Sequence, residues 1–123
     1  MIECDRHGLS FAASCCEHVR TAVDASAPLG AKVYIDHFTD PHHLCADCAS
    51  IVEAWIAVYR AGASSPEEPY YSESGVCVEC MREWYLTTGL GDLSSAVREA
   101  RKRRAELEIE HGAALEERGK ARP

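Results

Sequence analysis

The stretch LCADCASIVEAWIAVYRAG, residues 44–62, joins two cysteines at C-x2-C spacing to a helical pattern. Its apolar side chains recur at helical spacing: Cys48, Val52, Trp55 and Tyr59, with Ile51 and Val58 widening the stripe. Gly62 then supplies a C-cap. We expect a metal-binding knuckle at Cys45 and Cys48 that leads into a helix over residues 46–61, the main core element.

Three further Cys/His pairs lie along the chain: Cys4 with His7, Cys16 with His18, and Cys77 with Cys80. Structural zinc takes four nitrogen or sulfur ligands in a tetrahedron, so eight ligands predict two closed zinc sites, each Cys3His under the most even division. Cys15 is left over. Cys15 and His18 would have the commoner two-residue spacing, but we favour Cys16 as the ligand.

The spacing does not fix how the four pairs divide between two ions. Sequential use would join the first pair to the second and the third to the fourth, giving one Cys2His2 and one Cys4 site. A cross-brace would join the first to the third and the second to the fourth, giving two Cys3His sites. We slightly prefer the cross-brace.

Composition narrows the class of protein. The chain has 123 residues, enough for one domain, with 46% hydrophobic and 27% charged residues, which predicts a packed globular core. The net charge of -7 opposes non-specific attraction to phosphate backbones, so nucleic-acid binding is not expected. No signal peptide or membrane span is visible, and we expect a cytoplasmic protein. Seven cysteines, an odd number, then favour metal binding over disulfides.

The remaining sequence predicts a small α+β zinc-binding fold. Residues 1–19 suit an N-terminal hairpin with Leu9 and Phe11 as apolar anchors, and residues 31–38 alternate like a strand that Asp40 and Pro41 end. Residues 62–75 read as an exposed loop, and residues 75–78 as a short strand. A second helix is expected from Cys80 to Gly89, with its core side chains at Met81, Trp84 and Tyr85.

We expect a two-zinc domain over residues 1–92 and a charged C-terminal helix within residues 93–123. The helix should run from Ser94 to about Gly112 or further, with ion pairs at i, i+4 spacing. Its apolar stripe is narrow and consists of Leu93, Val97, Ala100 and Leu107. Arg104 and His111 interrupt this stripe, which predicts partial docking with a frayed end.

The runs CDRHG (4–8), CCEHV (15–19), LCADC (44–48) and VCVEC (76–80) resemble a group of small bacterial Cys/His zinc-binding proteins with a CxxHG, CxH, CxxC, CxxC arrangement. The resemblance covers residues 4 to about 85. Leu44 stands where that group commonly has an aromatic residue, and His42 and His43 are extra histidines. The resemblance implies the same eight ligands and brings no activity with it.

A looser, fold-level resemblance is to cross-brace modules of the RING and B-box class and to treble-clef zinc folds. The two C-x2-C pairs, each followed by a helix, predict two knuckle-plus-helix, treble-clef-like halves. The ligand order is not that of a RING, because the second ligand is a histidine and the C-x-H pair comes second.

Three functions follow from these features. With every pair used in a closed site, the first expectation is a non-catalytic, zinc-stabilised interaction or adaptor protein with an unknown protein partner. A basic partner would suit its charge, as for an acidic inhibitor or antitoxin.

The second hypothesis is an HNH-like metal-dependent nuclease. Asp36 and His37, followed by Pro41 and the knuckle at Cys45 and Cys48, resemble elements of that class. Three departures count against it: no Asn lies between His37 and Cys45, Ala49 replaces a metal-binding histidine, and only seven residues separate His37 from Cys45.

The third hypothesis is nucleic-acid binding through a basic cluster within residues 98–104: Arg98, Arg101, Lys102, Arg103 and Arg104. The neighbouring glutamates, which favour ion pairs within a solvated helix, weaken it.

Overall fold

The described residues form four helices and six strands, which confirms a small α+β fold. The computed structural model describes residues 1–63 and 69–120. Strands β1 (Ile2–Cys4) and β2 (Gly8–Ser10) form a hairpin. A second sheet has the order β4-β5-β3-β6, formed by β3 (Ala12–Cys16), β4 (Lys32–Ile35), β5 (Pro41–Leu44) and β6 (Glu73–Cys77). The helices are α1 (Glu17–Asp24), α2 (Ala46–Arg60), α3 (Val78–Thr87) and α4 (Leu93–Lys120).

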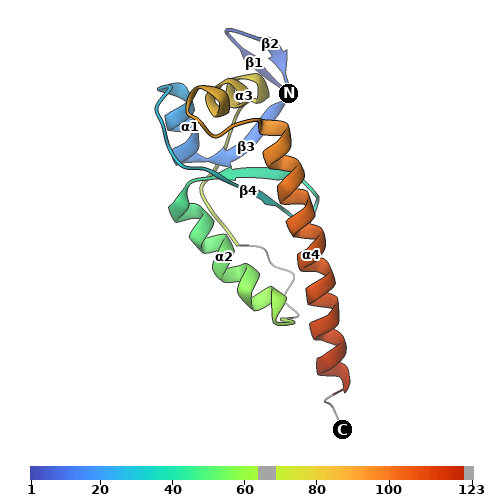
Figure 1. Ribbon diagram of the computed structural model, residues 1–123. Coiled ribbons are helices and arrows are strands. Elements are labelled where there is room, and N and C mark those ends of the chain that lie inside the picture. The colour runs from blue at the N-terminus through green and yellow to red at the C-terminus, as the bar shows by residue number, and fades with distance from the viewer. Residues whose placement is uncertain (64–68, 121–123) are drawn as a thin grey trace.

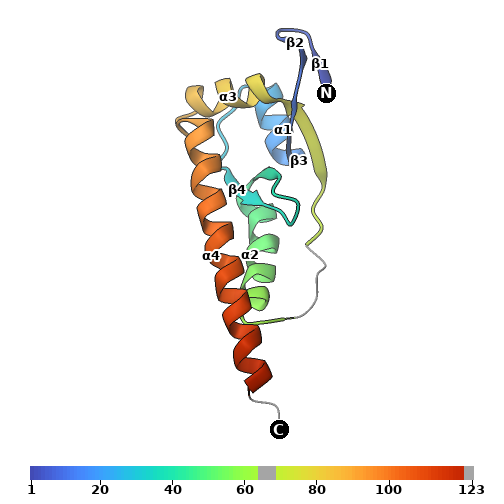
Figure 2. The same cartoon turned by 90° about the vertical axis from the view of Figure 1, so that its right-hand side faces the viewer.

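The direction of the central strand β3 organises the molecule. β3 runs parallel to β5, with Cys15 opposite His43, so both strands end at the same edge of the sheet. β6 runs antiparallel to β3, with Ala12 opposite Cys77, so β6 ends where β3 begins. Figures 1 and 2 show the consequence: the β1–β2 hairpin and α3 lie together at one end of the molecule.

Three helices begin directly after a cysteine. Cys16, Cys45 and Cys77 are the N-cap residues of α1, α2 and α3. The expected helix over residues 46–61 is confirmed within one residue, whereas α3 starts at Val78, before the expected Cys80. Helix α1 follows the C-x-H pair and was not predicted, because residues 1–19 were assigned to a hairpin alone.

The core lies where α1, α2 and α3 pack on the four-stranded sheet. Met81, Trp84 and Tyr85 of α3 are buried there, as predicted. On α2, Cys48 and Val52 are buried, but Ile51 and Val58 are exposed. The expected widening of the α2 stripe is therefore wrong: the buried face extends to Ala49 instead, where it meets the sheet. Other fully buried side chains are Cys15, Cys16, Val19, His43 and Leu44.

Strand β5 was not predicted, because its sequence, PHHL, begins with a proline and contains two adjacent histidines. Pro41 was expected to end a strand but instead begins β5, a position where its missing N–H is tolerated. His42 and His43 are both buried because each has a phenol partner distant in sequence. The His42 Nδ1 contacts the Tyr71 hydroxyl, and the His43 Nδ1 lies 2.6 Å from the Tyr85 hydroxyl.

The expected loop over residues 62–75 and the expected apolar anchors in the N-terminal segment both differ from the structure. Residues 62–75 do not form an exposed loop throughout, because β6 begins at Glu73 and Tyr71 is buried against His42; residues 64–68 of that prediction lie outside the described residues. Leu9 and Phe11 are exposed and are not anchors. The β1–β2 hairpin is a separate two-stranded sheet, and none of its residues belongs to the buried core cluster of the described residues.

Helix α4 docks on the rest of the protein along β4 and α2 (Figure 2). Leu93, Ala100 and Leu107 of the predicted stripe are buried. Arg104 and His111, which were expected to interrupt this stripe, instead contact other elements. Arg104 lies over the rings of Tyr34, Trp55 and Tyr59, and the His111 ring stacks on Tyr59. The helix runs to Lys120, in agreement with the expected extent to about Gly112 or further.

Candidate metal centres

All eight predicted ligands come together in two groups of four. The hairpin cluster consists of Cys4, His7, Cys77 and Cys80, and the central cluster consists of Cys16, His18, Cys45 and Cys48. In each cluster the four donor atoms lie within 4.8 Å of one another. Each cluster therefore offers three thiols and one imidazole.

The spacing of the donor atoms fits a tetrahedral ion. In the hairpin cluster the His7 Nδ1 is 3.4 Å from the Cys4 Sγ and 3.5 Å from the Sγ atoms of Cys77 and Cys80. In the central cluster the His18 Nδ1 is 3.4 Å from the Cys45 Sγ and 3.6 Å from the Cys48 Sγ. Zn–S and Zn–N bonds of about 2.3 and 2.05 Å give a tetrahedral S···N edge of about 3.6 Å. The distances from each imidazole nitrogen to these sulfur atoms are therefore close to the edge of a tetrahedral zinc site.

The division of the pairs is neither of the two that the spacing suggested. The first pair joins the fourth and the second joins the third, so both the cross-brace and the sequential arrangement are wrong, although both clusters are Cys3His. Strand direction is the reason. Parallel β3 and β5 bring Cys16 and Cys45 to one edge of the sheet, while antiparallel β6 carries Cys77 back to the hairpin.

Helix starts position the second half of each cluster. Cys77 caps α3 and Cys80 lies in its first turn, while Cys45 caps α2 and Cys48 lies in its first turn. The Cys48 N–H points at the Cys45 Sγ, 3.5 Å away. Because the N-terminus of a helix carries partial positive charge and free N–H groups, it favours a thiolate over a thiol. The same local structure thus forms the knuckle and starts the helix.

Cys16, and not its neighbour, belongs to the central cluster. The side chains of consecutive strand residues point to opposite faces, so only one of the two can face His18. The Cys45 N–H lies 3.4 Å from the Cys16 Sγ. Cys15 is completely buried in the hydrophobic core, where desolvation raises its pKa to about 12. Cys15 is an apolar packing residue and keeps its proton.

The thiols within each cluster differ in acidity before a metal binds. Burial raises the pKa of Cys48 and of Cys80 to about 12. The pKa of Cys4 is lowered to about 6 by the backbone N–H of Arg6 and by the His7 ring. A cation at the centre would remove this difference by stabilising all three thiolates, and binding would release protons.

Glu83 supports the hairpin cluster from outside. Its Oε1 lies 2.9 Å from the His7 Nε2, the nitrogen that faces away from the thiols, and its other oxygen pairs with Arg6. A carboxylate behind a ligating imidazole fixes the tautomer and orientation of the ring, a common arrangement around zinc. Sequence reasoning missed Glu83. Its signal was weak: a carboxylate one helical turn after Cys80, on the same face of α3.

The two residues of the nuclease hypothesis lie apart from both clusters. The Asp36 Oδ2 accepts a hydrogen bond from the His42 Nε2 at 2.7 Å, and the ring of His37 packs edge-on to Phe38. Among the described residues, the groups that could hold a metal do not include Asp36 or His37.

Three cations of the basic cluster of α4 contact β4 or the turn that follows it, although all members of the cluster except Arg104 are exposed. Arg101 donates to the Thr39 carbonyl at 2.7 Å, and Arg103 donates to the Val33 carbonyl at 3.4 Å. Arg104 donates to the Tyr34 hydroxyl and the Ile35 carbonyl and pairs with Glu108. These three cations help to dock the helix.

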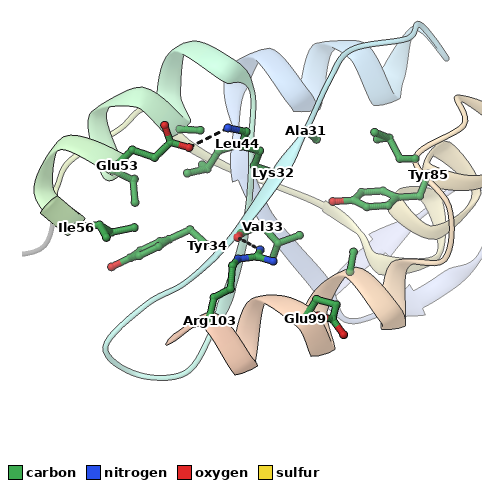
Figure 3. A pocket seen from close by; sticks show the side chains of 14 residues that line it. Ala31, Lys32, Val33, Tyr34, Leu44, Glu53, Ile56, Tyr85, Glu99 and Arg103 are labelled. Atoms are coloured by element: carbon green, nitrogen blue, oxygen red, sulfur yellow. Dashed lines mark hydrogen bonds and ion pairs between the residues drawn. The ribbon is translucent and has the colours of Figure 1, made fainter. Parts of the chain in front are cut away.

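A pocket of about 320 Å³ lies between β4, α2 and α4 (Figure 3). Aliphatic side chains line its floor, including Val33, Leu44 and Ile56. Its charged groups already have protein partners: Lys32 binds Glu53 at 2.9 Å, and Arg103 binds the Val33 carbonyl.

No protein-family model, curated protein or solved structure matches this chain. Among the described residues, no helix combines the length and apolarity needed to cross a membrane.

Proposed function

We propose that this chain is a non-catalytic, zinc-stabilised interaction protein that holds two structural zinc ions. The observation that carries the proposal is the pair of complete Cys3His clusters, each with four donor atoms within 4.8 Å. Four protein ligands fill a tetrahedral zinc ion, whereas catalytic zinc keeps a position open for water or substrate.

Zinc is the metal that suits this donor set. Thiolates select zinc, copper(I) and iron–sulfur clusters, and an imidazole beside three thiolates in a tetrahedron is a common structural zinc site. Each cluster also takes one pair from a knuckle or strand end and the other from a helix start, which supports a treble-clef-like interpretation of both halves.

The two ions stabilise the fold where a larger protein would rely on a larger hydrophobic core. The hairpin cluster ties β1–β2 to α3, and the central cluster ties the starts of α1 and α2 together. Structural zinc binding is worth about 10–16 kcal/mol of apparent folding free energy. We therefore expect metal analysis to give two zinc ions per chain, and chelation to unfold the protein cooperatively. One ion or none, or a chelated protein that keeps its fold, would contradict the two-site proposal.

An interaction role is supported by charge and exposed apolar side chains. The net charge of -7 favours a basic partner, because complementary charge speeds and orients association. Leu9 and Phe11, on and just after the metal-tied hairpin, are 66% and 71% exposed. An inhibitor or antitoxin of a basic protein is one form of this role, and an adaptor is another.

Two experiments separate this proposal from the other classes of function. Plasmid nicking with Mg²⁺ that disappears in His37→Ala would establish an HNH-like nuclease and overturn the non-catalytic role. Duplex binding with a steep salt dependence, lost on neutralising Arg98 and Lys102, would establish nucleic-acid association. We do not expect nicking, because Asp36 and His37 belong to neither metal cluster. We do not expect duplex binding, because the basic cluster contributes three of its five cations to docking α4.

A further inference from the structure

A second pocket, of about 350 Å³, lies between the β4–β5 turn and the segment that enters β6. Its lining consists of four Phe or Tyr rings, two carboxylates, two imidazoles and one proline: Tyr34, Phe38, Tyr70, Tyr71, Asp36, Glu73, His37, His42 and Pro69. Phe38 is 78% exposed and Tyr70 is 89% exposed, so large apolar rings stand at its rim. Neither metal cluster shares a residue with this pocket.

A hydrogen-bonded row of side chains fixes the wall of the pocket. The His42 ring is held at its Nε2 by Asp36, 2.7 Å away, and at its Nδ1 by the Tyr71 hydroxyl. Burial opposes ionisation of Asp36, but hydrogen bonds from His42 and from two backbone N–H groups bring its pKa below the usual value. Asp36 therefore carries a negative charge, but both of its oxygens already accept hydrogen bonds within the protein, so it contributes charge and not a free acceptor. The carboxylate that a ligand can reach is that of Glu73, which is 59% exposed and lies 3.9 Å from the His42 Nδ1.

The turn that carries Phe38 is also held in place. The Asp36 Oδ1 accepts hydrogen bonds from the N–H groups of Phe38 and Asp40, both at 2.9 Å. Arg101 of α4 then donates to the carbonyl of Thr39. These bonds hold the turn backbone and the Asp36, His42 and Tyr71 side chains without a ligand, which lowers the conformational entropy lost on binding.

Aromatic rings beside carboxylates form an environment for a cation, because ring faces and carboxylates both attract positive charge. The protein already uses this chemistry internally. The guanidinium of Arg104 lies 5.9, 5.8 and 5.7 Å from the ring centroids of Tyr34, Trp55 and Tyr59, and it pairs with Glu108. Tyr34 belongs to both places, since it also lines the second pocket.

We propose that this aromatic and acidic pocket binds an arginine side chain presented by a basic partner protein. The proposal rests on the proposed interaction role and names the surface that performs it. Arginine suits the pocket better than lysine, because its planar guanidinium stacks on aromatic faces and binds a carboxylate through two N–H groups. Arginine and aromatic side chains are also the residues that dominate binding energy at protein interfaces.

The test uses the zinc-loaded full chain and two short peptides. One is a blocked Gly-Arg-Gly peptide, and the other is its citrulline analogue, which has nearly the same shape but no charge. Amide chemical shifts are followed by NMR as each peptide is added to tens of millimolar. We expect saturable shifts from arginine confined to the residues around Phe38, His42 and Tyr71, and none that saturate from citrulline.

Exposed variants identify the groups responsible. We expect Phe38→Ala and Glu73→Gln each to weaken binding of the arginine peptide about two- to fivefold. Their matched controls are Leu86→Ala and Glu106→Gln, at exposed positions away from the pocket. Equal shifts with arginine and citrulline, no saturable shift with either, or equal weakening by control and pocket variants would overturn the proposal.

The outcomes also separate this inference from the proposed function. The arginine-pocket inference alone would fail if the protein held two zinc ions and had no nuclease activity but did not discriminate between arginine and citrulline. Nuclease activity would remove the non-catalytic role whether or not the pocket binds arginine.

Discussion

Replacing each of the two adjacent cysteines by alanine tests the assignment of the central cluster. Cys16 shares that cluster with His18, Cys45 and Cys48, whereas Cys15 is buried in the core. Both side chains have 0% exposure, so the packing lost on removing the sulfur is matched between the two variants. The difference between them therefore measures ligation.

The expected magnitudes follow from this arrangement. Removing one buried sulfur costs about 1–2 kcal/mol in lost burial and residual cavity. For Cys16→Ala an equal quarter share of a structural zinc site, about 2.5–4 kcal/mol, is lost as well. We expect Cys15→Ala to lower the unfolding free energy by about 1–2 kcal/mol and Cys16→Ala by about 3.5–6 kcal/mol. Zinc affinity at the central cluster should fall about 100-fold or more in Cys16→Ala alone.

Two measurements check this. Zinc released to chelators of graded strength should show two tightly held ions in Cys15→Ala and one in Cys16→Ala, and urea unfolding of the zinc-loaded proteins should give the stability difference. The assignment would be refuted if Cys15→Ala lost an ion, or if Cys16→Ala held both ions as tightly as the original protein.

Three further perturbations address the supports around the clusters. Glu83→Ala should lower the zinc affinity of the hairpin cluster about tenfold in chelator competition. This is the lower end of the range for such outer carboxylates, because Glu83 is 43% exposed. Glu79→Ala, on the same helix, should leave the zinc affinity of both clusters unchanged. Arg104→Met should lower the unfolding free energy by about 2–4 kcal/mol in urea, because the Arg104 side chain is only 10% exposed and the variant loses its three ring contacts and its hydrogen bonds. Arg98→Met, at an exposed position, should be nearly neutral. Burial raises the pKa of Cys48 to about 12, so zinc should displace the thiol proton and zinc affinity should fall as pH falls. Calorimetry in buffers of different ionisation enthalpy should detect the released protons. No proton release at pH 7 would contradict ligation by three thiolates.

Local features were predictable where the signal lies within a few residues. The α2 helix follows its apolar spacing, and the ligand pairs follow a knuckle that two intervening residues can form. Strand β5 was not predictable, because its two histidines are buried with Tyr71 and Tyr85 as partners, and both tyrosines come from distant segments. Helix α1 was missed for a related reason: its buried positions, Val19 and Ala22, are few and gain their meaning from the core they meet.

The sequence by itself determined the chemistry of this protein: six thiols and two imidazoles in four pairs, which imply two four-ligand sites whatever the fold. Only the tertiary structure decided which pairs share an ion, because that depends on whether β5 and β6 run with or against β3. Spacing along the chain carries no information about strand direction. The pairing of Glu83 with His7 and the aromatic pocket at the β4–β5 turn arise in the same way, from segments that meet only after the sheet has formed.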